Sequence, residues 1–318
     1  MKKVVLIMIF CTVVVATPLF SHAQLNADHS ASLELSPQAP LAHTDYSIKV
    51  TGTLIGRNSI TWFIDGKERP EFKNQNSIKL TAGDLGKSTT LDARVVFADG
   101  SVLDARQTIH PTRIDIIVTA DTTAPPFYEG RKLPTNGSTI TATAHVFTQV
   151  GKTEGIYSYL WKVNGKVQNG GALRGKNAIS FSSVFDANVQ VSVDVLDGNG
   201  QLVAQRSIQI PMIKPEVYFY ETNPLRGLSN VALPDPDIFI GDEVTLRAET
   251  YFMSALSQTA DMLAQWSINN IAVPSDAATN NEITLTKQGN GGRSTLSFKV
   301  HNIKQLLQNA EQSTIIQF

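Results

Sequence analysis

The chain has 318 residues, of which 17% are charged, and its 27 Lys and Arg nearly balance its 28 Asp and Glu. Acidic and basic residues are interleaved, so no basic stripe predicts nucleic-acid binding and no polybasic cluster predicts binding to an anionic membrane. The length allows several domains that each bury a core.

The N-terminus has the layout of a secretory signal. Met1-Lys2-Lys3 is a short basic head, and an apolar run follows from Val4 to Ala16. Ser21-His22-Ala23 presents small residues to a signal peptidase, so we expect a signal peptide of residues 1–23 and an exported protein that is periplasmic, surface-bound or extracellular. The alternative is an uncleaved anchor, the one membrane contact that the sequence suggests; the run is short for a spanning helix and Pro18 would break its end.

Cysteine use limits the chemistry of the mature protein. Cys11 is the only cysteine and lies in the segment expected to be removed. The mature chain would then have no disulfide, no thiolate metal site and no cysteine nucleophile. Its domains would depend on packing alone, for which about 100 residues each are sufficient.

A tryptophan recurs three times in the same local pattern, at Trp62, Trp161 and Trp266. The spacing of about 100 residues is the size of one immunoglobulin-type sandwich, in which a buried Trp on a central strand packs between two sheets. We therefore expect these residues to be the core pins of three tandem antiparallel sandwiches, at 24–112, 113–212 and 213–318. A tight hairpin turn is expected after each Trp, at Asp65-Gly66, Asn164-Gly165 and Asn269-Asn270.

Alternating apolar and polar residues predict the strands around each Trp. The strand before the Trp is expected over Tyr46–Gly52, Thr139–Phe147 and Glu243–Phe252. The later strands of the units are Leu91–Phe97 with Ser101–His110, Val189–Leu196 with Gln201–Ile210, and Ser294–Val300 with Ser313–Phe318.

Two long connections interrupt the second and third units, at Asp121–Ser138 and Thr222–Gly241. Loops of this length are usually functional or disordered. Their prolines and aromatic residues argue against disorder, so they either cover a sheet edge or contact the neighbouring domain. In the first of them Phe127, Tyr128 and Arg131 form a candidate partner-binding loop, since exposed aromatic residues mark partner surfaces. The alternative is that the two rings pack on their own sheet.

The last unit departs from the repeat at Asn302–Glu311. Ile303, Leu306, Leu307 and Ala310 have the spacing of one helix face, and Asn302 is a suitable N-cap. We expect a short amphipathic helix that covers the end of the third domain, with a partner-binding helix as the alternative.

The search for chemistry finds no catalytic residue, and we expect no enzyme, no cofactor and no metal. The chain has no Gly-x-Ser-x-Gly or His-Glu-x-x-His motif and no phosphate-binding glycine loop. Two clusters of Asp, Asn and Glu offer the oxygen ligands that Ca²⁺ prefers. Turn formation explains the first cluster better, because Asp-Gly-Asn-Gly suits a hairpin loop. The clusters are Asp194, Asp197 and Asn199, and Asp235, Asp237, Asp242 and Glu243.

The repeated Trp-x-β-branched-Asn/Asp-Gly pattern, with a closing hairpin that ends in proline, resembles the bacterial immunoglobulin-like and PKD-like modules of exported surface proteins. This resemblance implies sandwiches used as spacers, adhesion modules or display stalks, and it names no ligand. Short proline-bearing linkers would make the three domains a stiff rod, on the order of 100 Å long.

We therefore expect a non-enzymatic surface or envelope protein whose partner is a protein or a surface glycan. The alternatives are a carbohydrate- or polymer-binding accessory protein of an extracellular enzyme system, and a secreted enzyme whose paired carboxylates are not visible in the sequence.

Overall fold

A computed structural model describes residues 29–53, 58–148, 151–152, 156–184, 186–239, 241–255, 262–274, 281–289 and 291–318. The predicted signal peptide, with Cys11, lies outside the described residues. Within them the regular elements are β-strands and short 3-10 turns, such as η2 at Pro70–Phe72. The prediction of an all-β fold is confirmed for the described residues.

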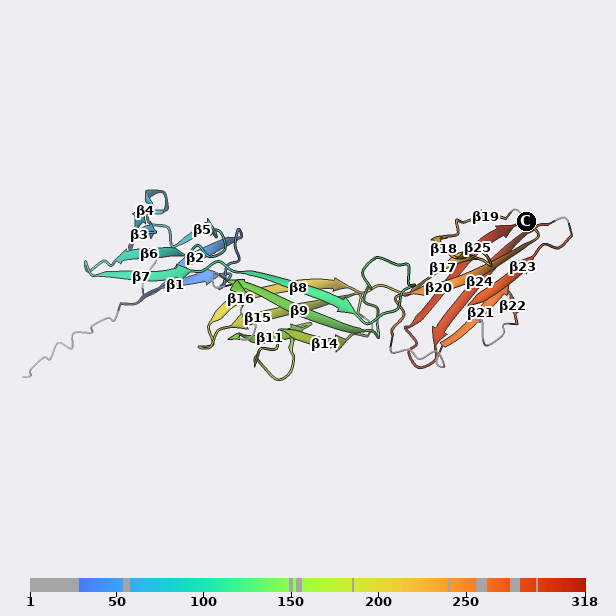
Figure 1. Cartoon of the computed structure of the whole chain (residues 1–318). Coiled ribbons are helices and arrows are strands. Elements are labelled where there is room, and N and C mark those ends of the chain that lie inside the picture. The colour runs from blue at the N-terminus through green and yellow to red at the C-terminus, as the bar shows by residue number, and fades with distance from the viewer. Residues whose placement is uncertain are drawn as a thin grey trace, which may run out of the picture.

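The sheets fall into three groups that follow one another along the chain (Figure 1). They span residues 31–109, 113–211 and 216–317, and we call them the first, second and third modules. Residues 110–112 and 212–215 lie between these groups. The domain boundaries expected after residues 112 and 212 stay predictions. In each module apolar side chains from two sheets form one core, which is the layout of an immunoglobulin-like sandwich.

The first module pairs a three-stranded sheet, in the order β1-β2-β5, with a four-stranded sheet, in the order β4-β3-β6-β7. All its ladders are antiparallel. Its strands are β1 Ala31–Ser36, β2 Asp45–Gly52, β3 Ser59–Ile64, β4 Lys67–Glu68, β5 Ser77–Thr81, β6 Thr89–Val96 and β7 Val102–Ile109.

The second module repeats this plan with additional strands. One sheet has the order β10-β9-β14 with β8 also on β9, and the other has the order β12-β11-β15-β16 with β13 also on β11. Its strands are β8 Arg113–Ala120, β9 Thr139–Thr148, β10 Gly151–Lys152, β11 Ser158–Val163, β12 Lys166–Val167, β13 Leu173–Arg174, β14 Ala178–Ser182, β15 Asn188–Leu196 and β16 Leu202–Pro211.

The third module has sheets in the orders β18-β17-β20-β23 and β19-β25-β24-β21-β22, and β19 runs parallel to β25. Its strands are β17 Glu216–Asn223, β18 Gly227–Ala232, β19 Asp237–Ile238, β20 Glu243–Tyr251, β21 Met262–Ile268, β22 Ile271–Val273, β23 Glu282–Thr286, β24 Arg293–Asn302 and β25 Asn309–Gln317.

Each module buries one tryptophan at its centre. Trp62, Trp161 and Trp266 are exposed by 0%, 2% and 1%. The indole N–H of Trp62 and that of Trp161 each donate to a backbone carbonyl of their own module, at 2.9 and 3.0 Å. Trp266 lies beside Phe219 and Phe298, with ring centroids 5.4 and 4.6 Å away. Burial of an indole of this size contributes about 4–6 kcal/mol.

The hairpin turn after each tryptophan has the left-handed backbone that the sequence predicted. Asp65, Asn164 and Asn269 have φ values of 49°, 47° and 49°. The side-chain oxygen of each also accepts a backbone N–H from the next strand of the sheet. An Asn or Asp at this position therefore serves both the turn and the sheet.

The helix predicted over Asn302–Glu311 is wrong. β24 continues through Asn302 and β25 begins at Asn309, so a short hairpin loop joins them. The side-chain oxygen of Asn302 accepts two backbone N–H groups of this loop, at 2.8 and 3.0 Å. Ile303 and Leu306 are 51% and 81% exposed. Ala310 instead lies on β25 and packs in the third core, so the residues of the stripe do not share one buried face. A helix this short is not stable without such a face.

The two long connections take different paths. Thr222–Gly241 contains β18, which covers the edge of β17, while Leu233 and Phe239 pack on the third core. Asp121–Ser138 instead reaches the third module, where it contributes to a separate apolar cluster. Both alternatives stated from the sequence therefore occur, one in each connection.

Candidate functional site

The rings of Phe127 and Tyr128 lie half-buried against the third module. Phe127 meets Tyr220 edge-on at a centroid distance of 5.1 Å, and Tyr128 meets Tyr251 at 5.5 Å. The Tyr128 hydroxyl donates to the carbonyl of Arg131 at 3.1 Å, and the Arg131 side chain is exposed. The two rings thus contact the neighbouring module rather than their own sheet. Binding of an external partner by this loop stays a prediction.

Backbone hydrogen bonds join the same two modules. The N–H of Phe252 donates to the carbonyl of Thr123 at 2.7 Å, and the N–H of Thr123 donates to the carbonyl of Met253 at 2.7 Å. The N–H of Ala255 donates to the carbonyl of Asp121 at 3.1 Å. These hydrogen bonds join the start of the second module's long connection to the segment that follows β20 in the third module.

A buried glutamine completes this junction. Gln308, in the β24–β25 loop, is 0% exposed. Its amide nitrogen donates to the hydroxyl of Thr135 at 3.0 Å and to the carbonyl of Asn136 at 2.6 Å. Its side-chain oxygen accepts the N–H of Ser254 at 2.6 Å. Both amide protons and the oxygen are therefore used, which is what burial of this side chain requires.

The sheet face beside this junction carries ionisable groups with raised pKa values. The hydroxyls of Tyr220 and Tyr251 are 2.6 Å apart, and burial raises the pKa of Tyr220. Burial also raises the pKa of Glu249 above its ordinary value of 4.5, although Arg247 lies 2.6 Å away and opposes this shift. Tyr128, Tyr251 and their neighbours line a shallow hollow of about 420 Å³. Most of its lining is apolar or aromatic, so it offers few groups for chemistry.

The junction between the first and second modules is built on Thr112. Its carbonyl accepts the N–H of Ala42 at 2.8 Å, and its hydroxyl donates to the carbonyl of Val203 at 3.2 Å. Leu41 packs partly against the second core. Thr112 itself is 3% exposed. One buried residue thus bonds to both modules.

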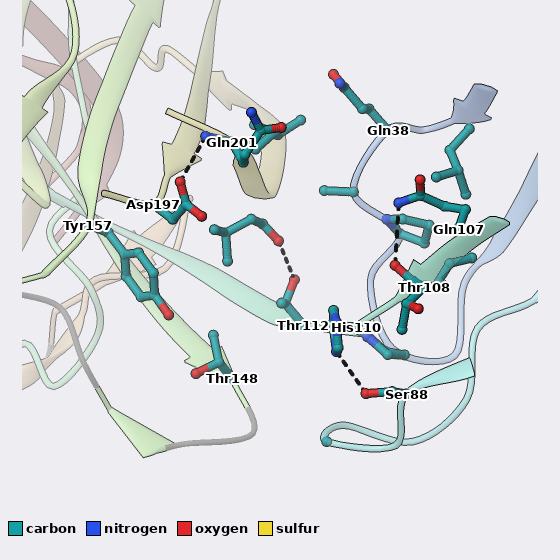
Figure 2. A pocket seen from close by; sticks show the side chains of 18 residues that line it. Gln38, Ser88, Gln107, Thr108, His110, Thr112, Thr148, Tyr157, Asp197 and Gln201 are labelled. Atoms are coloured by element: carbon teal, nitrogen blue, oxygen red, sulfur yellow. Dashed lines mark hydrogen bonds between the residues drawn. The ribbon is translucent and has the colours of Figure 1, made fainter. Parts of the chain in front are cut away.

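A groove of about 470 Å³ opens beside Thr112. Figure 2 shows Gln38, Gln107 and His110 on the side of the first module, facing Tyr157 and Gln201 on the side of the second. Apolar residues of both modules also line the groove, beside further hydroxyl residues and Asp197. The apolar residues are Leu35, Ala39, Pro40, Ile109, Pro111, Leu202 and Val203.

A second hollow of about 570 Å³ adjoins this groove. The two share Leu35, Leu202 and three glutamines, Gln38, Gln107 and Gln201. The second hollow continues over β1 and β2 of the first module, along residues 32–35 and 51. Together the two hollows make one extended depression across the junction, which we call the junction groove.

The ionisable groups of the junction groove are few and mostly engaged. Nδ1 of His110 lies 2.7 Å from the hydroxyl of Ser88. One oxygen of Asp197 accepts the backbone N–H groups of Asn199 and Gln201, both at 2.8 Å, so this carboxylate closes its own hairpin turn. No paired carboxylates and no activated nucleophile occur among the residues that line the groove, so the arrangement suits binding rather than reaction.

Metal ligation has no support in the part of the chain that the structure describes. There, no three or more His, Cys, Asp or Glu side chains gather as a metal site would require. Two residues of the candidate calcium clusters have other partners: Asp194 pairs with Lys162 at 2.8 Å, and Asp235 accepts the hydroxyl of Thr314 and the N–H of Ile315.

The junction groove was not found from the sequence. Its three glutamines lie in separate segments and follow no motif, and their proximity depends on how two modules meet. The one available signal was the short linker at Pro111, because a linker of so few residues forces the loops of adjoining modules together.

No known protein family and no curated protein matches the chain. Several solved structures of tandem modules show limited similarity. A structure of fibronectin(III)-like modules of Clostridium thermocellum CbhA is 16% identical, covers 57% of this chain and 93% of its own, and has a TM-score of 0.25. Three N-terminal domains of the bacteriophage RB49 outer capsid protein Hoc are 10% identical over 91% and 98%, with a TM-score of 0.25. The central fibronectin-III array of RIM-binding protein is 10% identical over 91% and 96%, with a TM-score of 0.29.

Proposed function

We propose that this chain is a non-enzymatic exported protein of the cell surface or envelope, in which tandem sandwiches act as a spacer that presents an interaction surface. The observation that carries the proposal is that both junctions have short linkers and are crossed by hydrogen bonds. Only residues 110–112 separate β7 from β8, and only 212–215 separate β16 from β17. Hydrogen bonds cross each junction, so the modules are held in line (Figure 1).

A spacer must keep its ends apart, and two features of the chain support this role. The linkers are short and contain proline, which stiffens a connection. Each module has its own apolar core, so each can be stabilised by packing within the module. Among the described residues, no helix is long and apolar enough to cross a membrane.

Small-angle X-ray scattering of residues 24–318 tests the spacer. We expect an elongated particle with a maximum dimension on the order of 100 Å. A compact particle would contradict the proposal. Mass spectrometry of the exported protein tests the location, with Gln24 expected as the first residue.

The alternative of a carbohydrate- or polymer-binding accessory protein draws support from one feature, the polar junction groove. It is compatible with the spacer, because a rod can also carry a binding site.

A further inference from the structure

We propose that the junction groove binds a neutral polysaccharide, with sugar units in contact with both the first and the second module. The proposal gives a ligand class to the interaction role proposed above and rests on that role.

The polar lining of the junction groove suits hydroxyl groups. Gln38, Gln107 and Gln201 each carry a carbonyl acceptor and an amide donor, and Tyr157 carries a hydroxyl. A sugar hydroxyl also donates and accepts, so each glutamine can bind it from either direction. Gln38 and Gln201 are exposed and Gln107 is half-buried, so the amides are accessible from solvent.

The apolar lining suits the other face of a sugar. Both hollows share Leu35 and Leu202, and Pro40 and Val203 line the hollow beside Thr112. A pyranose ring has polar edges and C–H faces, so it fits a site in which amides stand beside aliphatic side chains. Binding pockets generally combine such apolar lining with a few placed polar groups, often where two domains meet.

Charge argues for a neutral ligand. No Lys or Arg lines either hollow, whereas Asp197 and Glu34 do. An anionic polymer would approach two carboxylates without a compensating cation. Asp197 is already bonded to backbone N–H groups of its turn, which leaves the amides and hydroxyls as the main polar groups for a ligand.

The length of the junction groove argues for a polymer rather than a monosaccharide. Each hollow alone, at about 470 and 570 Å³, is within the usual size range for a small-molecule site. The two are continuous through five shared residues. A linear chain of several sugars can therefore occupy both hollows.

Affinity gel electrophoresis of residues 24–318 tests the proposal. The probes are a neutral β-glucan, a xylan and a galactomannan, with polygalacturonate as the anionic comparison and an array of neutral surface glycans as a second source of the same chemistry. We expect retardation by at least one neutral probe. The double variant Gln107→Ala/Gln201→Ala should bind it at least about tenfold more weakly, a difference of about 1.4 kcal/mol.

Gln209→Ala is the matched control, because Gln209 is exposed on β16, the strand that begins directly after Gln201, but lies outside both hollows. It should bind as the wild type does. Thermal melts of each variant establish that the fold is intact. A ligand that spans both modules should also raise the melting temperature of the wild type, since it binds only the folded chain.

Three results would overturn the proposal. These are retardation by polygalacturonate alone, equal binding by the double variant, and no retardation by any neutral probe or array glycan. Scattering on the same samples separates this failure from failure of the spacer. An elongated particle that binds no glycan would contradict the proposed ligand but not the spacer. A compact particle would contradict the spacer.

Discussion

The two junctions of this chain differ in how many segments they join. The second–third junction draws on the long connection of the second module, the end of β20 and the β24–β25 loop, with Gln308 buried among them. The first–second junction is centred on Thr112, and the junction groove opens beside it. We infer that the second and third modules move as one body, while the first module is held less firmly.

The two junctions differ in their contacts although their linkers are alike. Both linkers are short and contain proline, so linker composition alone would predict similar junctions. The difference comes from a loop that extends into the next module and brings Phe127 and Tyr128 with it. A hollow lies at each junction, but the one at the second–third junction is mostly apolar or aromatic, whereas the junction groove carries three glutamines.

The largest effect on stability is expected from unfolding the second module, which takes part in both junctions. Trp161→Ala removes the buried indole at the centre of the second module and should cost about 3–5 kcal/mol of unfolding free energy. Denaturant titration measures this. Val167→Ala is the control, because Val167 is 49% exposed in the hairpin next to Trp161 and its loss should cost little. A loss below about 1 kcal/mol for Trp161→Ala would mean that the indole does not hold the core together.

The next effect is expected at the second–third junction alone. Gln308→Ala leaves the N–H of Ser254 and the carbonyl of Asn136 without their partner, and it should destabilise the contact by about 1–3 kcal/mol. Proteolysis within 213–215 should become faster as the two modules separate. Gln312→Ala, a half-buried glutamine on β25, is the matched control. Unchanged proteolysis in Gln308→Ala would refute its role at the junction.

A smaller effect is expected at the first–second junction. Thr112→Val keeps the shape of the side chain but removes the hydroxyl that donates to Val203. The expected cost is about 0.5–1.5 kcal/mol, measured as a shift in the denaturation midpoint. A larger cost than that of Gln308→Ala would reverse the ranking of the two junctions.

The smallest effect should appear in the pH dependence of the third module. The folded pKa of Glu249 is raised, so folding favours its protonated form. This contribution is fully present below the unfolded pKa and is lost as the pH rises through the folded value. Stability should therefore fall as the pH rises from about 4.5. In Glu249→Gln this part of the decline should disappear; an identical pH profile in the variant would show that another group is responsible.

Local patterns allowed much of the fold to be predicted from the sequence. Trp161 and Asn164 occupy positions whose requirements are local, a buried strand and a left-handed turn, so their roles follow from neighbouring residues. The Asn302–Glu311 prediction failed because periodicity cannot show that Ala310 packs in the core as a strand residue while Ile303 and Leu306 stay exposed in a loop. The junctions could not be predicted for the same kind of reason: Gln308 lies more than 170 residues from Thr135, to which it donates.

The most direct test of the unequal junctions is a measurement of distances between paired spin labels. Residues 24–318 have no native cysteine, so labels can be placed cleanly at the exposed strand positions Lys79, Ala178 and Thr286. We expect a narrow distance distribution for Ala178→Cys/Thr286→Cys and a broader one for Lys79→Cys/Ala178→Cys. Equal widths, or a broader distribution across the second and third modules, would contradict the account.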